Sequence, residues 1–290
     1  MNIIDTSKGL LSAYESGNFE IERWKKYADS WIPGAKELCL ADMQECLDAG
    51  YSWETDYLPV LNGVVKNADK REEAVRLFRK VTGQLEEKIL GRFGKTVDAD
   101  VVMYLGLCNG AGWVTKINER TTVLLGIEKI IELDWCNEDD MNGLIIHEMG
   151  HVCQAQHGLF RVKTDNQSDR FLWQLFTEGV AMVFEQEIIG SSDYFHQDKD
   201  GWKEWCDRNE GLILKAFLED LNTMTSETQR YFGDWVRFEG YCDTGYYIGA
   251  KFVRYLLNFD SFDRVITYDL RRVKEEFEKY CDESLPKWSE

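Results

Sequence analysis

The sequence has little of what usually separates domains. Only 3 of its 290 residues are proline, and no stretch rich in Pro, Gly or Ser divides one part of the chain from another. Linkers between independently folded domains commonly have that composition. We therefore expect one continuous domain, in which a helical scaffold over residues 1–95 is followed by a core over residues 96–290.

Basic residues are scarce relative to acidic ones. The chain has 34 Lys and Arg against 52 Asp and Glu, which gives a formal net charge of −18 at pH 7. Such a surface repels phosphate backbones and anionic lipid, so we expect no nucleic-acid partner and no membrane. No apolar run approaches the roughly 20 residues that span a bilayer. The first residues contain no basic segment followed by an apolar one, which favours a cytoplasmic protein.

Paired cysteines are also lacking. The 8 cysteines lie scattered along the chain, and no two form a C-x-x-C pair. This pattern excludes a disulfide scaffold and disfavours a metal site built from clustered thiolates. We expect reduced thiols that serve as small core residues.

The apolar pattern predicts helices at both ends of the chain and strands near its middle. In residues 74–89, apolar side chains recur at steps of three and four between charged ones, as on a helix with one buried face. Residues 101–105 and 121–131 are short runs rich in β-branched side chains, separated by a turn-forming cluster at residues 109–112. Helical spacing returns from residue 139. The expected fold class is α+β, mostly α-helical with a small central sheet.

Residues 147–151 read H-E-M-G-H and match the pattern H-E-x-x-H. On a helix, His147 and His151 lie on one face, since four residues turn through about 400°, and both imidazoles can reach one metal ion. Glu148 is then placed to take a proton from a water molecule on that metal. Residues 145, 149 and 152 form an apolar stripe away from the histidines, and residues 137–140 supply capping oxygens for the start of the helix.

A zinc site needs a third protein ligand, and two candidates compete for that position. His157 stands six residues after His151, as in the metzincin pattern, but Gln154 replaces the glycine that breaks the helix there. Without a break, His157 would point roughly 120° away from His151. The rival is Glu178, which lies within a mainly apolar row of a second helix, where a carboxylate needs a positive partner.

The H-E-x-x-H residues, followed by Glu178-Gly179-Val180-Ala181, resemble the arrangement of gluzincin metallopeptidases. More narrowly, residues 101–259 resemble an uncharacterised family of predicted zinc-dependent proteases. In that family a short sheet precedes the H-E-x-x-H helix and a Gly-Tyr-rich helix follows it, which here is residues 245–251. The resemblance implies a zincin-like fold and one Zn²⁺ per chain. It also implies that His147, His151 and Glu178 are the ligands and that Glu148 is the base.

The same resemblance suggests supporting roles for further residues. Tyr246, or next to it Tyr247, would stabilise the oxyanion. Apart from the resemblance, the β region itself has two interpretations: an edge strand near residues 109–114 that could hold an extended peptide by backbone hydrogen bonds, or a plain hairpin turn. Two features depart from the family. The interval from His151 to Glu178 is long, and Met182 stands where some gluzincins carry an acid that orients a histidine, a role that Glu185 could take.

The expected function is zinc-dependent hydrolysis of a peptide or protein substrate. The alternative is a metal-stabilised binding or regulatory module without turnover, although such a site gains nothing from the adjacent base Glu148. The substrate, the choice between endo- and exopeptidase action and the oligomeric state stay open.

Overall fold

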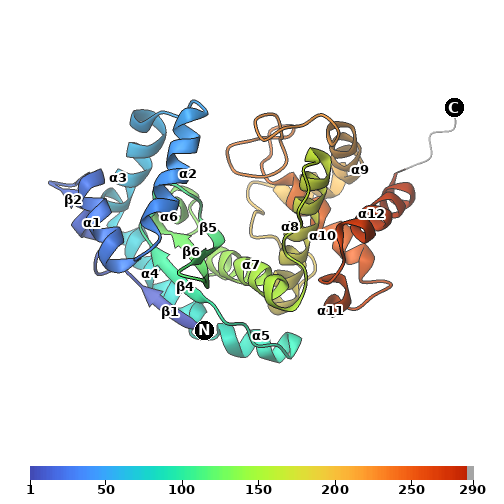
Figure 1. Cartoon of the computed structure of the whole chain (residues 1–290), viewed down its shortest axis with the longest axis horizontal. Helices are drawn as coiled ribbons and strands as arrows, with labels where there is room; N and C mark the ends of the chain where they lie inside the picture. The colour runs from blue at the N-terminus through green and yellow to red at the C-terminus, as the bar shows by residue number, and fades with distance from the viewer. Residues whose placement is uncertain (286–290) are drawn as a thin grey trace. The chain divides into compact units, whose positions relative to one another are not determined.

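A computed structural model describes residues 1–285 of the chain. The fold is α+β, 58% helical with a small mixed sheet, so the expected fold class is confirmed. The chain forms two compact units, Met1–Glu148 and Met149–Glu290, and each is described by itself (Figure 1). Helix α7 (Glu138–His157) is unbroken, and the division between the units falls inside it, directly after Glu148.

The first unit contains a four-stranded sheet with the strand order β1-β4-β6-β5. Strands β1 (Asn2–Asp5), β4 (Asp100–Tyr104) and β6 (Arg120–Gly126) run parallel, and β5 (Gly112–Ile117) pairs antiparallel with β6. The inner strands β4 and β6 are buried on both faces, which explains their uninterrupted apolar runs. Strand β5 is an edge strand in the described part of the chain, because β6 is the one strand that pairs with it there.

Three details of this unit differ from expectation. Residues 2–5 form β1, although the segment before residue 95 was expected to be helical. Residues 127–131 are not strand but belong to α6 (Ile127–Glu132), because their apolar side chains repeat at three and four residues. The cluster at residues 109–112 is not a hairpin turn: it leads from β4 to the edge strand, and the hairpin turn lies at Asn118 and Glu119, between β5 and β6.

Helices surround the sheet of the first unit. They are η1 (Leu10–Ala13), α1 (Ile21–Trp31), α2 (Lys36–Asp48), η2 (Trp53–Tyr57), α3 (Leu58–Lys66), α4 (Ala68–Thr82) and α5 (Leu85–Phe93), with a two-residue ladder of β2 (Tyr14–Glu15) and β3 (Asn18–Phe19). The predicted apolar stripe is buried, but it is shared between α4 and α5. From α1, Trp24 Nε1 donates to the carbonyl oxygen of Leu105 at 2.9 Å, which anchors the end of β4.

The second unit packs helix against helix. It contains the last turns of α7 and the helices α8 (Gln167–Ile189), α9 (Trp202–Asp220), α10 (Thr244–Leu256), α11 (Phe262–Val265) and α12 (Leu270–Ser284). A Cβ atom on Gly179 of α8 would lie 2.1 Å from the carbonyl oxygen of Gly249 on α10. On the same helix, Ala181 lies against Gly150 of α7. Glycines therefore let α8 lie against both neighbours.

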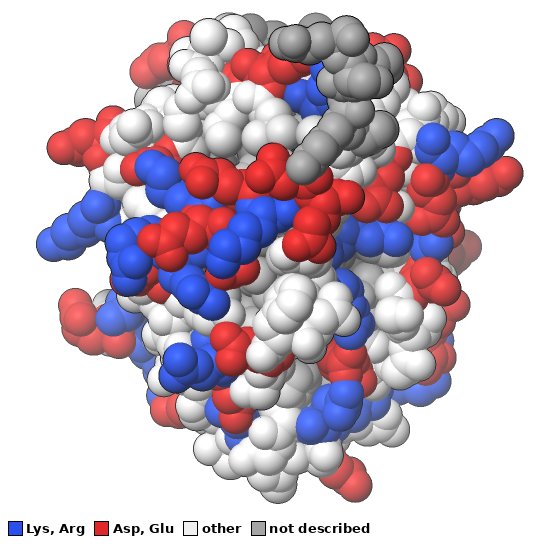
Figure 2. All heavy atoms as spheres, turned by 90° about the vertical axis from the view of Figure 1, so that its right-hand side faces the viewer, with Lys and Arg blue, Asp and Glu red and all other residues white. Residues whose placement is uncertain are grey.

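The cysteines and the surface charges follow the pattern of the composition. All eight cysteines are free, in agreement with the expected reduced thiols. In the face shown in Figure 2, Lys and Arg side chains alternate with Asp and Glu, so the negative charge does not gather into one patch there. Pairs such as Arg271 with Glu275 on α12 follow the same alternation. Among the described residues, no helix is long and apolar enough to cross a membrane.

Candidate metal centre

Helix α7 begins and packs as its sequence predicts. Asn137 Oδ1 accepts a hydrogen bond from the backbone N–H of Asp140 at 3.0 Å, which caps the helix start. Ile145, Met149 and Val152 are fully buried and anchor one side of the helix. His147 and His151 lie one turn apart on another side, and both are buried.

Helix α8 brings Glu178 to this face of α7. The close contact between Gly150 and Ala181 sets the two helices together. Glu178 Oε2 lies 3.2 Å from Nε2 of His151, and the Glu178 side chain is 14% exposed. One ligand atom from each of His147, His151 and Glu178 lies within 4.8 Å of the others. The structure thus gathers the three residues that the resemblance implies as ligands.

His157, the rival third ligand, belongs to no such group. It is the last residue of α7, which continues without a break through Gln154, and its side chain is exposed. Because the helix does not break, the imidazole keeps the rotation that carries it away from His151.

The carboxylate of Glu148 lies over the start of the edge strand. A Cβ atom on Gly112 would come within 2.7 Å of Glu148 Oε1, so a larger residue at position 112 would push this carboxylate aside. The loop before Gly112 is held by Glu128 of α6, which accepts N–H bonds from Gly106 and Cys108 at 2.9 and 3.1 Å. Burial raises the pKa of the Glu128 carboxyl to about 7, while the two backbone donors lower it.

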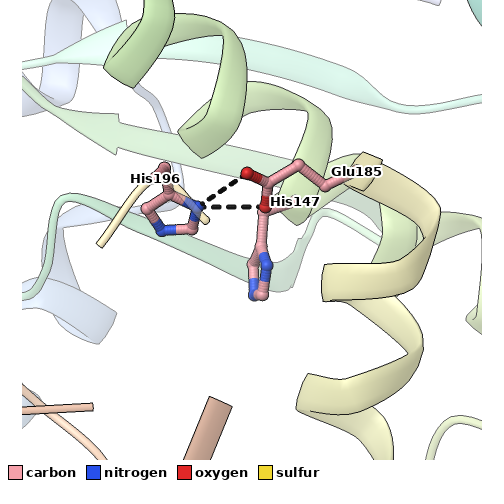
Figure 3. A group of neighbouring side chains, drawn as sticks. All are labelled: His147, Glu185 and His196. Atoms are coloured by element: carbon pink, nitrogen blue, oxygen red, sulfur yellow. Dashed lines mark hydrogen bonds and ion pairs between the residues drawn. The ribbon is translucent and has the colours of Figure 1, made fainter. Parts of the chain in front are cut away.

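A second group of candidate ligands was not expected as a set. It consists of His147 with Glu185 of α8 and His196 of the following loop, whose ligand atoms also lie within 4.8 Å of one another. His196 Nδ1 is 3.0 Å from both carboxylate oxygens of Glu185 (Figure 3). The Glu185 side chain is fully buried, and that of His196 is 5% exposed. Glu185 had been considered as a partner that orients a histidine, but no motif pointed to His196.

One further acidic residue, Asp243, lies directly before α10 and close enough to Glu178 to be affected by its charge. Burial raises the pKa of Asp243 to about 7; the N–H of Gly233 lowers it, and the charges of Asp234 and Glu178 raise it further.

The two tyrosines of α10 differ in their contacts. The hydroxyl of Tyr247 donates to Asp207 and Glu210 at 2.8 and 3.2 Å, so it already has carboxylate partners. The half-buried ring of Tyr246 lies 6.1 Å from the ring of Phe232, and its role in catalysis stays a prediction.

The residues of both groups suit a zinc ion. Imidazole nitrogen and carboxylate oxygen are ordinary zinc ligands, and small side-chain rotations from this spacing reach the roughly 2.0–2.2 Å that zinc requires. The two groups of candidate ligands differ in how far solvent can reach their carboxylates. Glu178 is partly exposed, whereas Glu185 is fully buried. Catalytic zinc keeps one position open for water, so the group with His151 and Glu178 fits a catalytic ion better.

Comparisons with known protein families, with curated proteins and with solved structures found no match to this chain.

Proposed function

We propose that this protein is a zinc-dependent peptidase with a zincin-like fold and a gluzincin-type site. The observation that carries the proposal is the gathering of His147, His151 and Glu178 from two helices, with their ligand atoms within 4.8 Å of one another. These residues would hold one Zn²⁺ per chain. Glu148, the residue after the first histidine, would be the base.

Each residue of the candidate metal centre has a separate role in the proposed reaction. Zinc held there would polarise the scissile carbonyl and make a water molecule more acidic. Glu148 would accept a proton from the water molecule whose oxygen attacks the carbonyl carbon, and would then deliver this proton to the departing amine. Tyr246 is proposed to donate a hydrogen bond to the oxyanion that forms. A low-polarity surrounding strengthens each of these interactions, and Glu148, His147 and His151 are all buried.

The edge strand supports a peptide as the substrate. Strand β5 pairs with β6 on one side, and its Gly112 lies against the Glu148 carboxylate. An extended peptide that added itself to the free side of β5 would be held by backbone hydrogen bonds beside the base. This arrangement requires no particular side chain of the peptide, which favours hydrolysis with broad sequence tolerance.

The test is to measure zinc content and peptide hydrolysis together. We expect Glu148→Gln to keep one zinc per chain and to lose activity by about 10³-fold, because the base is removed while the ligands stay. Glu138→Gln is the matched control, since it makes the same change at the exposed start of the same helix. Glu178→Ala should lose zinc, and His157→Ala should retain it.

Other outcomes would count against the proposal. A wild-type chain that binds no zinc after reconstitution would contradict it. Zinc binding without hydrolysis of any peptide in a broad library would favour the binding or regulatory module instead.

A further inference from the structure

The pair formed by Glu185 and His196 lies beside the candidate metal centre, but neither residue belongs to the proposed ligand set. Glu185 is on α8, two turns after Glu178, and His196 is in the loop that follows this helix. Figure 3 shows the Glu185 carboxylate turned toward the His196 ring, with the side chain of His147 next to the same carboxylate. A ring nitrogen of His147 lies within 4.8 Å of ligand atoms of both residues.

The pair is costly to bury. The Glu185 side chain has no exposed surface, and Ala181, Met182 and Phe184 on the same stretch of α8 are also fully buried. Moving a carboxylate out of water costs several kcal/mol, and apolar residues of similar size would pack there at lower cost. Packing alone therefore does not account for a glutamate and a histidine at these positions.

The geometry of the pair is that of a hydrogen bond. Nδ1 of His196 is equally distant, 3.0 Å, from both oxygens of Glu185, as expected for an N–H group that points between the oxygens of a carboxylate. Because a carboxylate has about four acceptor positions, Glu185 can hold His196 and still accept an N–H from a second imidazole. A ring nitrogen of His147 lies within 4.8 Å of a Glu185 carboxylate oxygen, so a small rotation of the His147 side chain would complete this second hydrogen bond.

We propose that Glu185 and His196 are positioning residues for His147, an inference that rests on the proposed function. Glu185 accepts the N–H of the His147 nitrogen that faces it, which leaves the other nitrogen with its lone pair for zinc. His196 fixes the rotation of the Glu185 carboxylate. The new element is His196, which acts on the metal centre only through Glu185.

The proposal predicts a specific loss of zinc affinity. Removing a group that orients a metal-bound histidine typically weakens metal binding by about 10–100-fold, because the ring loses its fixed tautomer and direction. His196→Ala should show a loss in this range while one zinc per chain still binds at saturation. His196→Asn should restore most of the affinity, since the asparagine amide places an N–H close to the position of Nδ1.

The experiment is a zinc titration of the full chain against a chelator of known affinity. The variants are His196→Ala, His196→Asn and Glu185→Asp, and His157→Ala is the control, because it removes an exposed histidine that belongs to neither group. Circular dichroism of each metal-free variant checks that it folds. If His196→Ala fails to fold, Glu185→Asp decides, because it keeps the buried charge but moves the carboxylate away from His147. The absorption spectrum of the Co²⁺-loaded chain gives a second readout that a purely structural role would not change.

The possible results separate this inference from the proposed function. Wild-type zinc affinity in both His196→Ala and Glu185→Asp would overturn the positioning role and leave the peptidase proposal intact. A second zinc ion in the wild type that disappears in His196→Ala would also overturn it, because His196 would then be a ligand. A wild type that binds no zinc would overturn both proposals.

Discussion

Each unit contains a fully buried glutamate, and the two are stabilised by different partners. In the first unit, Glu128 accepts hydrogen bonds from the backbone N–H groups of Gly106 and Cys108. In the second unit, Glu185 is hydrogen-bonded to the imidazole of His196 and lies near that of His147. The partners indicate what each carboxylate does: Glu128 shapes a loop, whereas Glu185 faces groups that can bind a metal.

The comparison shows why burial alone is a poor guide to function. Both glutamates are inaccessible, and both would be flagged as unusual core residues. Only the one surrounded by imidazoles belongs to a set of atoms that could share a cation. Four experiments test this distinction; the stabilisation by zinc should be the largest effect, and the change in kcat at Gly112 the smallest.

Zinc should stabilise the chain through the candidate metal centre formed by His147, His151 and Glu178, and not through Glu128. At a free zinc concentration about 1,000 times the dissociation constant, binding to the folded state alone adds about 4 kcal/mol to the free energy of unfolding. Thermal unfolding with zinc and with EDTA measures this gain. We expect Glu178→Ala to lose the gain and Glu128→Gln to keep it. A gain that vanished in Glu128→Gln would show that the two buried groups are coupled.

The close approach of α8 to α10 should be sensitive to one added methyl group. In Gly179→Ala, the new Cβ would meet the carbonyl oxygen of Gly249 at 2.1 Å, and backbone cannot move aside cheaply. We expect a loss of about 1–3 kcal/mol in the free energy of unfolding, measured in urea with EDTA present. Gly211→Ala is the matched control in the same unit, because a Cβ there meets nothing within 4 Å. It should be neutral or stabilise by up to about 1 kcal/mol.

Glu128 should make the stability of the chain depend on pH. Its pKa is about 7 in the folded chain and 4.5 in its ordinary state, so the folded chain binds this proton more tightly than the unfolded chain does. The contribution to stability is therefore full below pH 4.5 and is lost as the pH rises to 7. The total change is about 3 kcal/mol, since a pKa difference of one corresponds to about 1.4 kcal/mol.

Glu128→Gln isolates this effect, since glutamine does not titrate. The free energy of unfolding of the variant, relative to wild type, should rise between pH 4.5 and 7 and level off above that window. Urea unfolding at several pH values with EDTA present measures the difference. A constant difference across the window would show that Glu128 stays charged in the folded chain and that its backbone donors outweigh its burial.

Much of the fold class could be predicted from local pattern, but pairings between distant segments could not. Apolar side chains that recur every three or four residues predicted α7, and short continuous apolar runs predicted β4 and β6. Strand β1 was missed because its four residues, with two of them exposed, carry almost no pattern of their own. It forms only because it pairs with β4, about 98 positions along the chain, as Asn2 opposite Asp100 shows. Helix α6 was merged with β6 because isoleucine favours strands and also packs well on a short buried helix.

The candidate site likewise contains residues that local sequence pattern predicts and residues that it does not. His147, Glu148 and His151 follow from spacing on one helix, and Glu178 from the cost of a carboxylate in an apolar row. His196 lies in a loop without periodicity, and its partner Glu185 looks like one more helical residue. The one available signal was scarcity: the chain has only 4 histidines, and three of them, His147, His151 and His196, belong to the two groups of candidate ligands. Which residues a loop brings to a buried carboxylate depends on tertiary structure.

The smallest predicted effect concerns the contact between Gly112 and the Glu148 carboxylate. In Gly112→Ala, the added methyl group would come within 2.7 Å of Glu148 Oε1 and must push this carboxylate aside. A flexible side chain can yield, so we expect stability within about 0.5 kcal/mol of wild type and unchanged zinc content. The Glu148 carboxylate, however, would move away from its present position. A displacement of a catalytic group that approaches 1 Å lowers the rate by up to about 10²-fold. We expect kcat to fall by about 10-fold with a smaller change in KM. If kcat stays at the wild-type value while zinc and stability are also unchanged, Glu148 does not act from the position beside the edge strand.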